Sequence, residues 1–193
     1  LAVGLDIEKY HKETLEKHER VRSELKRYIQ RLEYRLQEYI KRGDHIIIEG
    51  AQGTLLDINM GTIPDVTSSH LLLGHAFPSL GLSRKDFKII CVEKIYPTRV
   101  GNGYLPTLNE EEFGESTVKR GGEFGATTGR KRRVGYPDWV LTKRAAMLND
   151  ADFFYITRID VVQGQKLKVC NNYDINGKIS PEVPLDISIV KPV

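Results

Sequence analysis

The residues best suited to do chemistry lie together at positions 125–133, which run Gly-Ala-Thr-Thr-Gly-Arg-Lys-Arg-Arg. Glycine lets a ligand approach the main chain closely, and the hydroxyls of Thr127 and Thr128 both donate and accept hydrogen bonds. Arginine grips a carboxylate or phosphate with two parallel hydrogen bonds, and lysine binds it as a point charge. This stretch predicts a pocket for a small, strongly anionic ligand. A solvated basic turn and a nucleic-acid-binding patch are the alternatives for the stretch taken alone.

A second candidate is the glycine turn at 50–53, Gly-Ala-Gln-Gly, which directly follows the apolar run 45–49. Open α/β sheets bind ligands at the carboxyl ends of their strands, and the amide of Gln52 offers a donor and an acceptor to the edge of a base. The turn is not a Walker loop, because no Gly-Lys-Ser/Thr closes it. A plain strand-to-helix turn is the alternative. The hydroxyls at 67–69 likewise suit either a phosphate site at a helix start or a cap without ligand.

A third candidate is the segment Thr157-Arg158-Ile159-Asp160, which follows the apolar run 153–156. The Asp160 carboxylate can accept two parallel hydrogen bonds from the ring N–H and the exocyclic amine of guanine, a pair of donors that adenine lacks. The long side chain of Arg158 can lie over the base. An aspartate that only caps a turn is the alternative.

Three short apolar runs, 45–49, 88–93 and 153–156, are rich in β-branched or aromatic residues and predict strands, the first two of them buried. A strand pair is expected over 166–173 and 178–190, around a turn at Asn176-Gly177. Every functional candidate is therefore expected at the carboxyl end of a strand.

Helix is predicted from Asp6 to about Arg42, as one long helix or two end to end, because apolar residues recur every three or four positions. Asp6 is the expected N-cap and Gly43 the expected stop. A further helix is expected over 138–149, with its apolar residues, Met147 among them, turned partly inward. Positions 106–122 are predicted to be irregular, with Glu110 to Glu112 exposed.

Strands that alternate with helices predict an α/β fold with a mostly parallel central sheet flanked by helices, preceded by a long N-terminal amphipathic helical region. No internal repeat or linker divides the chain. The prediction is a single domain over 1–193, with the helical region in 1–43 and the ligand loops of the sheet edge in 44–193.

The composition excludes several classes of protein. With 193 residues, 40% of them hydrophobic, the chain is long enough for a real core. Its formal net charge of +3 does not by itself indicate a nucleic-acid or membrane partner. It has no run of about 18 apolar residues. Cys91 and Cys170 lie in apolar segments and are expected to be buried thiols in a reducing, cytoplasmic compartment. The first residue is Leu1, so we expect a piece of a longer protein.

Taken in order, these motifs resemble the adenylosuccinate synthetase family. The matching segments are 49–58 (Glu-Gly-Ala-Gln-Gly-Thr-Leu-Leu-Asp-Ile), 66–69 (Val-Thr-Ser-Ser), 98–101 (Thr-Arg-Val-Gly), 123–130 (Glu-Phe-Gly-Ala-Thr-Thr-Gly-Arg) and 157–160. Together they cover most of residues 44–175. Members of this family are GTP-dependent ligases that join IMP to L-aspartate. GTP phosphorylates the 6-oxygen of IMP, and the aspartate amine then displaces that phosphate.

The resemblance implies a role for each matching residue. The expected IMP contacts are Gln52 at the base, Thr67 at the phosphate, Val100 at the ribose, and Arg130. The expected L-aspartate loop comprises Ala126, Thr127, Thr128, Gly129, Arg130, Lys131 and Arg132. The expected GTP contacts are Arg132, Arg158, Ile159 and Asp160. The resemblance also implies a cytoplasmic homodimer that uses Mg²⁺, with neither nucleic acid nor membrane as a partner.

The chain departs from the family pattern in two ways. Arg158 stands where the family usually has lysine, and because arginine also stacks on a purine we expect guanine selectivity to survive. Residues 1–45 show no counterpart of the family's glycine-rich phosphate loop, with its catalytic aspartate and magnesium contacts, or of its catalytic histidine. The C-terminal segment that completes the guanine pocket and the arginine that crosses the dimer also have no match. We therefore assign no catalytic residue and no metal ligand within 1–193.

Two other classes of function remain as alternatives. One is a different purine-nucleotide-binding ligase or a GTP-binding regulator, which binding of IMP compared with GMP, ATP and GTP would distinguish. The other is an RNA-binding module that uses Arg130 to Arg133, whose affinity would fall steeply with salt. The sequence lacks the aromatic-rich strand surface on which such modules stack bases.

The departures generate a prediction for residues 1–193 expressed alone. Without the general base and the magnesium loop, this segment should form no adenylosuccinate from IMP, L-aspartate and GTP. Turnover is measured by the absorbance change that accompanies adenylosuccinate formation. Product formation by the segment alone would contradict the prediction.

Overall fold

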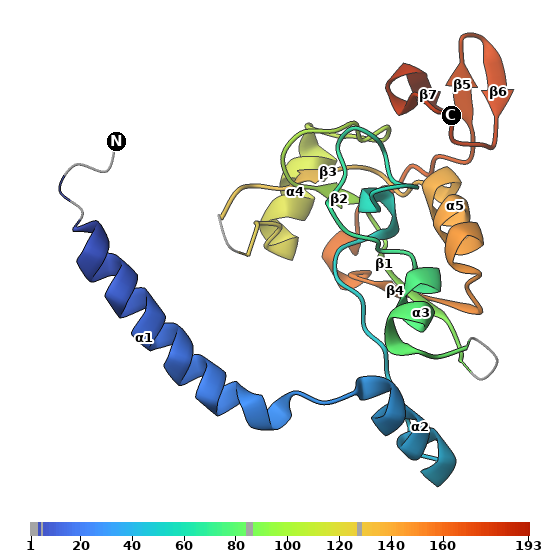
Figure 1. Cartoon of the computed structure of the whole chain (residues 1–193). Helices are drawn as coiled ribbons and strands as arrows, with labels where there is room; N and C mark the ends of the chain where they lie inside the picture. Colours follow the sequence, from blue (N-terminus) through green and yellow to red (C-terminus); the bar gives the residue numbers. More distant parts are fainter. Residues whose placement is uncertain (1–3, 5, 84–86, 127–128) are drawn as a thin grey trace. The chain divides into compact units, whose positions relative to one another are not determined.

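The computed structural model describes residues 4, 6–83, 87–126 and 129–193. The chain divides into two compact units, Leu1–Ile47 and Ile48–Val193, and Figure 1 shows the elements of each. The boundary falls close to the predicted end of the helical region at residue 43. The single domain over 1–193 stays a prediction.

The first unit is helical. It contains α1 (Ile7–Leu25), the 3-10 turn η1 (Lys26–Tyr28) and α2 (Leu32–Arg42), so the predicted helical region consists of two helices end to end. Asp6 caps α1, since its carboxylate accepts the backbone N–H of Lys9 at 3.0 Å. Gly43 ends α2 with φ 77°, a left-handed conformation that glycine adopts without strain. Both predicted helix ends are confirmed.

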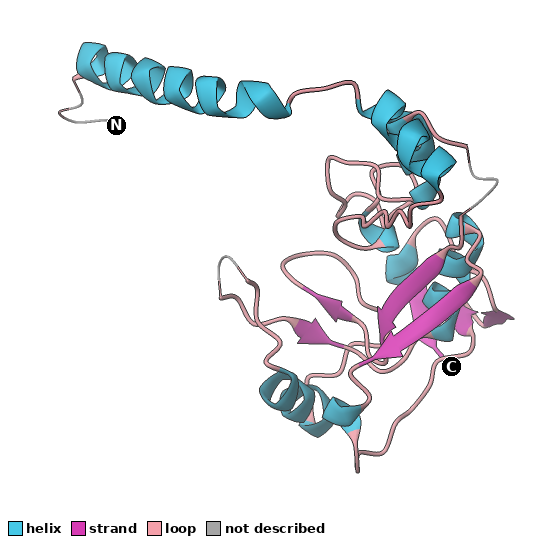
Figure 2. Cartoon of the chain, turned by 90° about the horizontal axis from the view of Figure 1, so that it is seen from below, coloured by secondary structure: helices cyan, strands magenta, loops and turns pink. Residues whose placement is uncertain are grey.

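The second unit is organised on a parallel strand pair. β1 (Ile90–Lys94) pairs with β4 (Phe153–Thr157), with Ile90 opposite Phe153 and Lys94 opposite Thr157. In Figure 2 these two long arrows lie side by side and point the same way. Both strands therefore deliver the residues that follow them to the same edge. The α/β class and two of the predicted strands are confirmed.

Some strand predictions are wrong. Residues 45–49 form no strand, and Ile47 is 92% exposed. An apolar β-branched run becomes a strand only when another strand satisfies its backbone, and no strand in the described part of the chain pairs with it. The outward side chains of β1, such as Val92 at 70% exposure, are also not buried as predicted.

The segment 106–122 contains a helix that the sequence analysis missed, α4 (Glu112–Gly121). Its buried residues, Phe113, Gly114, Thr117, Val118 and Gly121, recur at helical spacing. Three of those are glycine or threonine, so the apolar pattern was too weak to predict a helix. Glu110, Glu111 and Glu112 are exposed, as predicted.

The remaining strands form small antiparallel sheets. β2 (Thr98–Arg99) pairs with β3 (Arg133–Val134), and the second sheet has the order β6 (Lys178–Ser180), β5 (Tyr173–Ile175), β7 (Val190–Pro192). Asn176 and Gly177 connect β5 to β6 with φ 55° and 86°. Positive φ at both central residues is typical of a type I′ hairpin turn, so the predicted turn is confirmed. The predicted strand over 166–173 is wrong, because 166–172 form no strand and β5 begins only at Tyr173; of 178–190, β6 covers the first three residues.

Short helical elements complete the second unit. They are η2 (Thr54–Leu56), η3 (Leu73–His75), α3 (Ala76–Leu80), α5 (Trp139–Asn149), η5 (Asp160–Val162) and η6 (Ile187–Ile189). α5 confirms the helix predicted over 138–149, although Met147 is 71% exposed rather than turned inward. In the described part of the chain, no helix combines the length and the apolar character needed to cross a membrane.

Two clusters of buried side chains form the core of the second unit. One gathers Tyr96, Phe113, Val118, Val134, Val161 and Val162. The other gathers Val140, Leu141, Cys170, Tyr173, Ile187 and Val190. Both cysteines are free thiols; Cys170 is buried as predicted, whereas Cys91 is only partly buried.

Asp138 joins α5 to the second cluster. Its carboxylate accepts the backbone N–H groups of Val140 and Leu141 at 3.1 Å, which caps the helix, and the Tyr173 hydroxyl at 2.7 Å. Asp138 and Tyr173 are both buried. A buried carboxylate is stable only if hydrogen bonds replace its lost hydration. This bond therefore ties β5 to the start of α5.

We predict that Tyr173→Phe lowers the free energy of unfolding by about 1–3 kcal/mol, because it removes a donor from a buried carboxylate. The matched control is Tyr104→Phe, whose hydroxyl donates to the Val190 carbonyl at 3.2 Å from a more exposed position, and whose cost should stay below about 1 kcal/mol. Urea unfolding of the two variants measures both. Equal effects would contradict the role given to Asp138.

Candidate functional site

A buried carboxylate, that of Glu123, lies just beyond the end of β1. Its side chain is fully buried and accepts hydrogen bonds from the Lys94 ammonium at 2.7 and 2.8 Å and from the Tyr96 hydroxyl at 2.9 Å. The Arg132 guanidinium adds a third partner at 2.8 Å. Three side chains from β1, the segment after it and the glycine loop therefore meet on one negative charge.

The cluster contains one negative charge, on Glu123, and two positive charges, on Lys94 and Arg132. Burial acts to raise the pKa of Glu123, but hydrogen bonds from Lys94, Tyr96 and Arg132 outweigh it and hold the pKa below the usual value. Burial lowers the pKa of Lys94, opposed by Glu123 and assisted by the positive charges of Arg132 and Arg158. Glu123 is consequently ionised at neutral pH and faces more than one cation.

Glu123 lies at the start of the glycine loop, and Arg132, at the end of the loop, bonds back to it. The backbone N–H of Arg132 donates to the Glu123 carbonyl at 2.9 Å, and that of Gly125 donates to the Arg130 carbonyl at 2.8 Å. These bonds pair residues 123–125 with residues 130–132. Ala126, Gly129 and Arg130 lie exposed on it, whereas Thr127 and Thr128 lie outside the described residues.

The four cations of the loop have different environments. Lys131 pairs with Glu115 of α4, Arg132 with Glu123, and Arg133 donates to the carbonyls of Gly101 and Gly103 at 2.7 and 2.6 Å. Among the described residues, no partner bonds to the guanidinium of Arg130. Arg130 is thus the loop cation most available to an added anion.

A second buried carboxylate, Asp57, shapes the loop from η2 to η3. It accepts the backbone N–H groups of Asn59, Met60, Leu71 and Leu72 at 2.6–3.3 Å. Burial acts to raise the pKa of Asp57, but these four bonds outweigh it and lower the pKa to about 2. Asp57 therefore holds together a segment that has little regular structure of its own.

Arg99 connects this loop to the one that follows β1. It donates to the Thr62 hydroxyl at 3.0 Å, to the Asp65 carbonyl, and to the Asn102 carbonyl at 2.8 Å. Thr67, partly buried, and Val100, 43% exposed, lie on the two loops that Arg99 joins. Gln52 is exposed just before η2, with φ 52°.

The turn after β4 lies near the Glu123 cluster. Arg158 has φ 64°, and Asp160 begins η5. The charges of Arg158 and Asp160 both act on the Tyr96 hydroxyl, whose pKa is raised mainly by burial and by Glu123. The charges of Arg132 and Arg158 both act on Lys94, so this turn and the end of the glycine loop both lie within electrostatic reach of the Glu123 cluster. A common crevice shared by Gln52, Arg130 and Asp160 stays a prediction.

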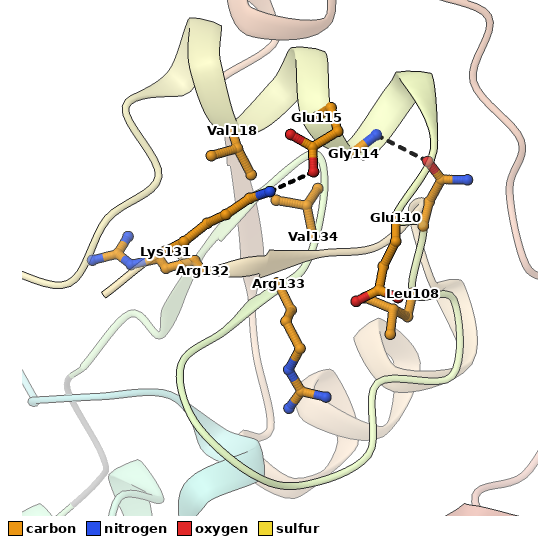
Figure 3. Close-up of a pocket in the computed structure, with 10 residues that line it drawn as sticks. Leu108, Glu110, Gly114, Glu115, Val118, Lys131, Arg132, Arg133 and Val134 are labelled. Carbon is orange, nitrogen blue, oxygen red and sulfur yellow. Dashed lines mark hydrogen bonds and ion pairs between the residues drawn. The ribbon is translucent and has the colours of Figure 1, made fainter. Parts of the chain in front are cut away.

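A cavity of about 250 Å³ opens between α4 and the end of the glycine loop. It is lined by Leu108, Asn109, Glu110, Gly114, Glu115, Val118, Lys131, Arg132, Arg133 and Val134. Figure 3 shows Lys131 reaching Glu115 beneath α4, while the guanidinium groups of Arg132 and Arg133 point away from that pair. Within the described residues, no cluster of three or more His, Cys, Asp or Glu could hold a metal ion.

The sequence analysis missed the residues that position the predicted contacts: Asp57, Lys94, Tyr96, Arg99 and Glu123. One signal was available for Lys94, since a charged residue at the end of an apolar strand faces the ligand edge of a parallel sheet. For Glu123 there was no such signal, because two of its partners, Lys94 and Tyr96, lie 29 and 27 positions away in sequence.

The chain is similar to known proteins over nearly its whole length. The profile of the adenylosuccinate synthetase family matches residues 3–193. The adenylosuccinate synthetase of Pelotomaculum thermopropionicum is 42% identical over 169 residues, covering 86% of this chain and 40% of the relative. That of Thermodesulfovibrio yellowstonii is 42% identical over 190 residues, covering 94% and 45%.

The structural comparison agrees. The structure of fully ligated adenylosuccinate synthetase from Plasmodium falciparum superposes with a TM-score of 0.90 and 28% identity, covering 99% of this chain and 46% of that one. The chain thus spans less than half the length of the relatives it matches.

We predict that Asp57→Asn lowers the free energy of unfolding at pH 7 by about 1–3 kcal/mol, because an amide offers weaker acceptance and places a donor against the backbone N–H groups. Since the folded-state pKa lies below the unfolded one, the stabilisation is present above about pH 4 and is lost as pH falls towards 2.

Denaturant unfolding from pH 7 to pH 3 measures this, and the variant should lose stability less steeply than the parent as pH falls. Asp44→Asn is the control, since that carboxylate is exposed and pairs with Arg42; its effect should stay below about 1 kcal/mol. Parallel pH profiles for parent and D57N would contradict the role of Asp57.

Proposed function

Because this chain belongs to the adenylosuccinate synthetase family, we propose that the whole protein is a GTP-dependent ligase that joins IMP to L-aspartate. The products are adenylosuccinate, GDP and phosphate. The observation that carries the proposal is the buried Glu123 cluster: it holds Arg132, and the charges of Arg158 and Asp160 reach two of its other members, Lys94 and Tyr96. The reaction needs a site for the carboxylates of L-aspartate next to a site that selects guanine.

We propose that IMP lies against Gln52, Thr67, Val100 and Arg130. The three hydrogen bonds of Arg99 support the placement of Thr67 and Val100 near one another, because they join the two loops concerned. The exposed guanidinium of Arg130 supports a contact with a dianionic phosphate or an oxyanion.

L-Aspartate is proposed to bind along the loop Ala126, Thr127, Thr128, Gly129, Arg130, Lys131 and Arg132. A dicarboxylate needs cations held at a set spacing, and Arg132 is held by Glu123 at 2.8 Å. The backbone N–H of Gly125 donates to the Arg130 carbonyl and that of Gly129 to the Gly125 carbonyl, which holds the described ends of the loop together.

GTP is proposed to contact Arg132, Arg158, Ile159 and Asp160. In this arrangement the Asp160 carboxylate accepts from the guanine ring N–H and exocyclic amine, and Arg158 covers the base. The proximity of both residues to Tyr96 supports a guanine site next to Arg132, which would place the transferable phosphate near the cationic loop.

The chemistry follows from this placement. An oxygen on the purine ring is a poor leaving group, and its phosphorylation by GTP makes it displaceable by the aspartate amine. Negative charge develops during both steps, and cations fixed before the reaction stabilise it without reorganisation. We propose that Mg²⁺ assists GTP through ligands elsewhere in the protein, and that the protein is a cytoplasmic homodimer.

The test uses the full-length protein and Asp160→Asn. An asparagine cannot accept both guanine donors, so we expect the KM for GTP to rise about 10- to 100-fold, while the KM for IMP is unchanged. Initial rates of adenylosuccinate formation measure both constants. Glu112→Gln, which alters an exposed carboxylate of α4, is the control and should leave both unchanged.

Absence of turnover in the unsubstituted protein would refute the proposed ligase. Turnover with an unchanged KM for GTP in D160N would refute the role of Asp160 alone.

A further inference from the structure

We propose that Glu123 is a positioning residue for the cationic loop: it sets the place of the Arg132 guanidinium and so controls the affinity for L-aspartate and GTP, but not for IMP. This inference rests on the proposed ligase function and deepens it, because it states which substrates depend on the contact between Glu123 and Arg132 and which one does not. Glu123 acts through Arg132 and has no contact of its own with a substrate in the proposed arrangement.

Glu123 is positioned to hold several side chains in place. It is fully buried, and its two oxygens accept from Lys94, Tyr96 and Arg132 at 2.7–2.9 Å. Its backbone takes part as well, since the carbonyl accepts the N–H of Arg132 at 2.9 Å. Arg132 is therefore held at both its main chain and its side chain by one residue.

The negative charge is necessary because the neighbouring groups are cations. Lys94 and Arg132 converge on Glu123, and the positive charge of Arg158 also reaches Lys94. Without the carboxylate, these cations would repel each other in a partly buried region where the repulsion is weakly screened. The Arg132 guanidinium would then move away from its present position.

The adjacent cation, Lys131, is held by a weaker ion pair. Lys131 pairs with Glu115, but both side chains are about half exposed, at 50% and 60%. Exposed ion pairs contribute little and exchange readily with water. Arg132, at 29% exposure against a carboxylate at 0%, is the fixed cation of the two.

The same carboxylate links two substrate sites. Tyr96 donates to Glu123 and is also within the electrostatic reach of Arg158 and Asp160. A change at Glu123 should therefore alter the affinity for L-aspartate and the affinity for GTP. By contrast, no bond joins the Arg130 guanidinium to this cluster among the described residues, so the proposed IMP contacts should be spared.

The experiment measures the three KM values and kcat of the full-length protein and of Glu123→Gln. Small misplacements of a binding group can cost on the order of 100-fold, so we expect kcat/KM for L-aspartate to fall roughly 10- to 100-fold. The KM for GTP should rise with that for aspartate, and the KM for IMP should not change.

A matched control separates positioning from general damage. Asp138→Asn also alters a buried, hydrogen-bonded carboxylate, but one that caps α5 outside the proposed sites. It should lower the melting temperature and leave all three KM values unchanged. Tyr96→Phe removes a single donor from Glu123 and should shift the aspartate and GTP constants in the same direction as E123Q, by a smaller factor.

Each outcome decides the matter. Unchanged aspartate and GTP constants in E123Q, or an equal rise for all three substrates, would overturn the inference. If E123Q does not fold, Y96F decides alone, and unchanged constants in it would overturn the inference. No turnover in the unsubstituted protein refutes the proposed function and this inference with it, whereas turnover with an unshifted aspartate constant refutes only the inference.

Discussion

The ionic cluster around Glu123 is the interaction on which the rest of the second unit depends. A carboxylate with no exposed surface is stable only when donors replace its hydration, and here Lys94, Tyr96 and Arg132 supply them. These donors come from the end of β1, the segment after it and the end of the glycine loop. One charge thus determines where three separate segments lie relative to each other.

Other charged side chains also bond to several groups at once, in parts of the chain with little regular structure. Asp57 gathers four backbone N–H groups, Arg99 bonds to acceptors on two loops, and Asp138 combines a helix cap with a tyrosine hydroxyl. Loops cannot satisfy their backbone groups through ladders or helical turns, so side chains must do it. The candidate ligand loops are therefore built by charged residues that are not themselves among the proposed contacts.

Much of the local structure was predictable because its causes are local. Asp6 and Gly43 end the helical region as expected, and Asn176-Gly177 forms the expected hairpin turn because both residues tolerate positive φ. The failures have tertiary causes. Residues 45–49 have strand composition but no partner strand among the described residues, and α4 is held by glycines and a threonine that pack closely rather than by a conspicuous apolar stripe.

The sequence by itself predicted the kind of chemistry and the segments proposed to carry it: a cationic glycine loop, an amide at a turn and a carboxylate after a strand. The motif order was also enough to indicate the family. Only the tertiary structure decided that Glu123 unites Lys94, Tyr96 and Arg132, and that Arg99 bridges two loops. The reason is physical, because a residue's burial and its partners depend on segments that are distant in sequence and meet only when the chain folds.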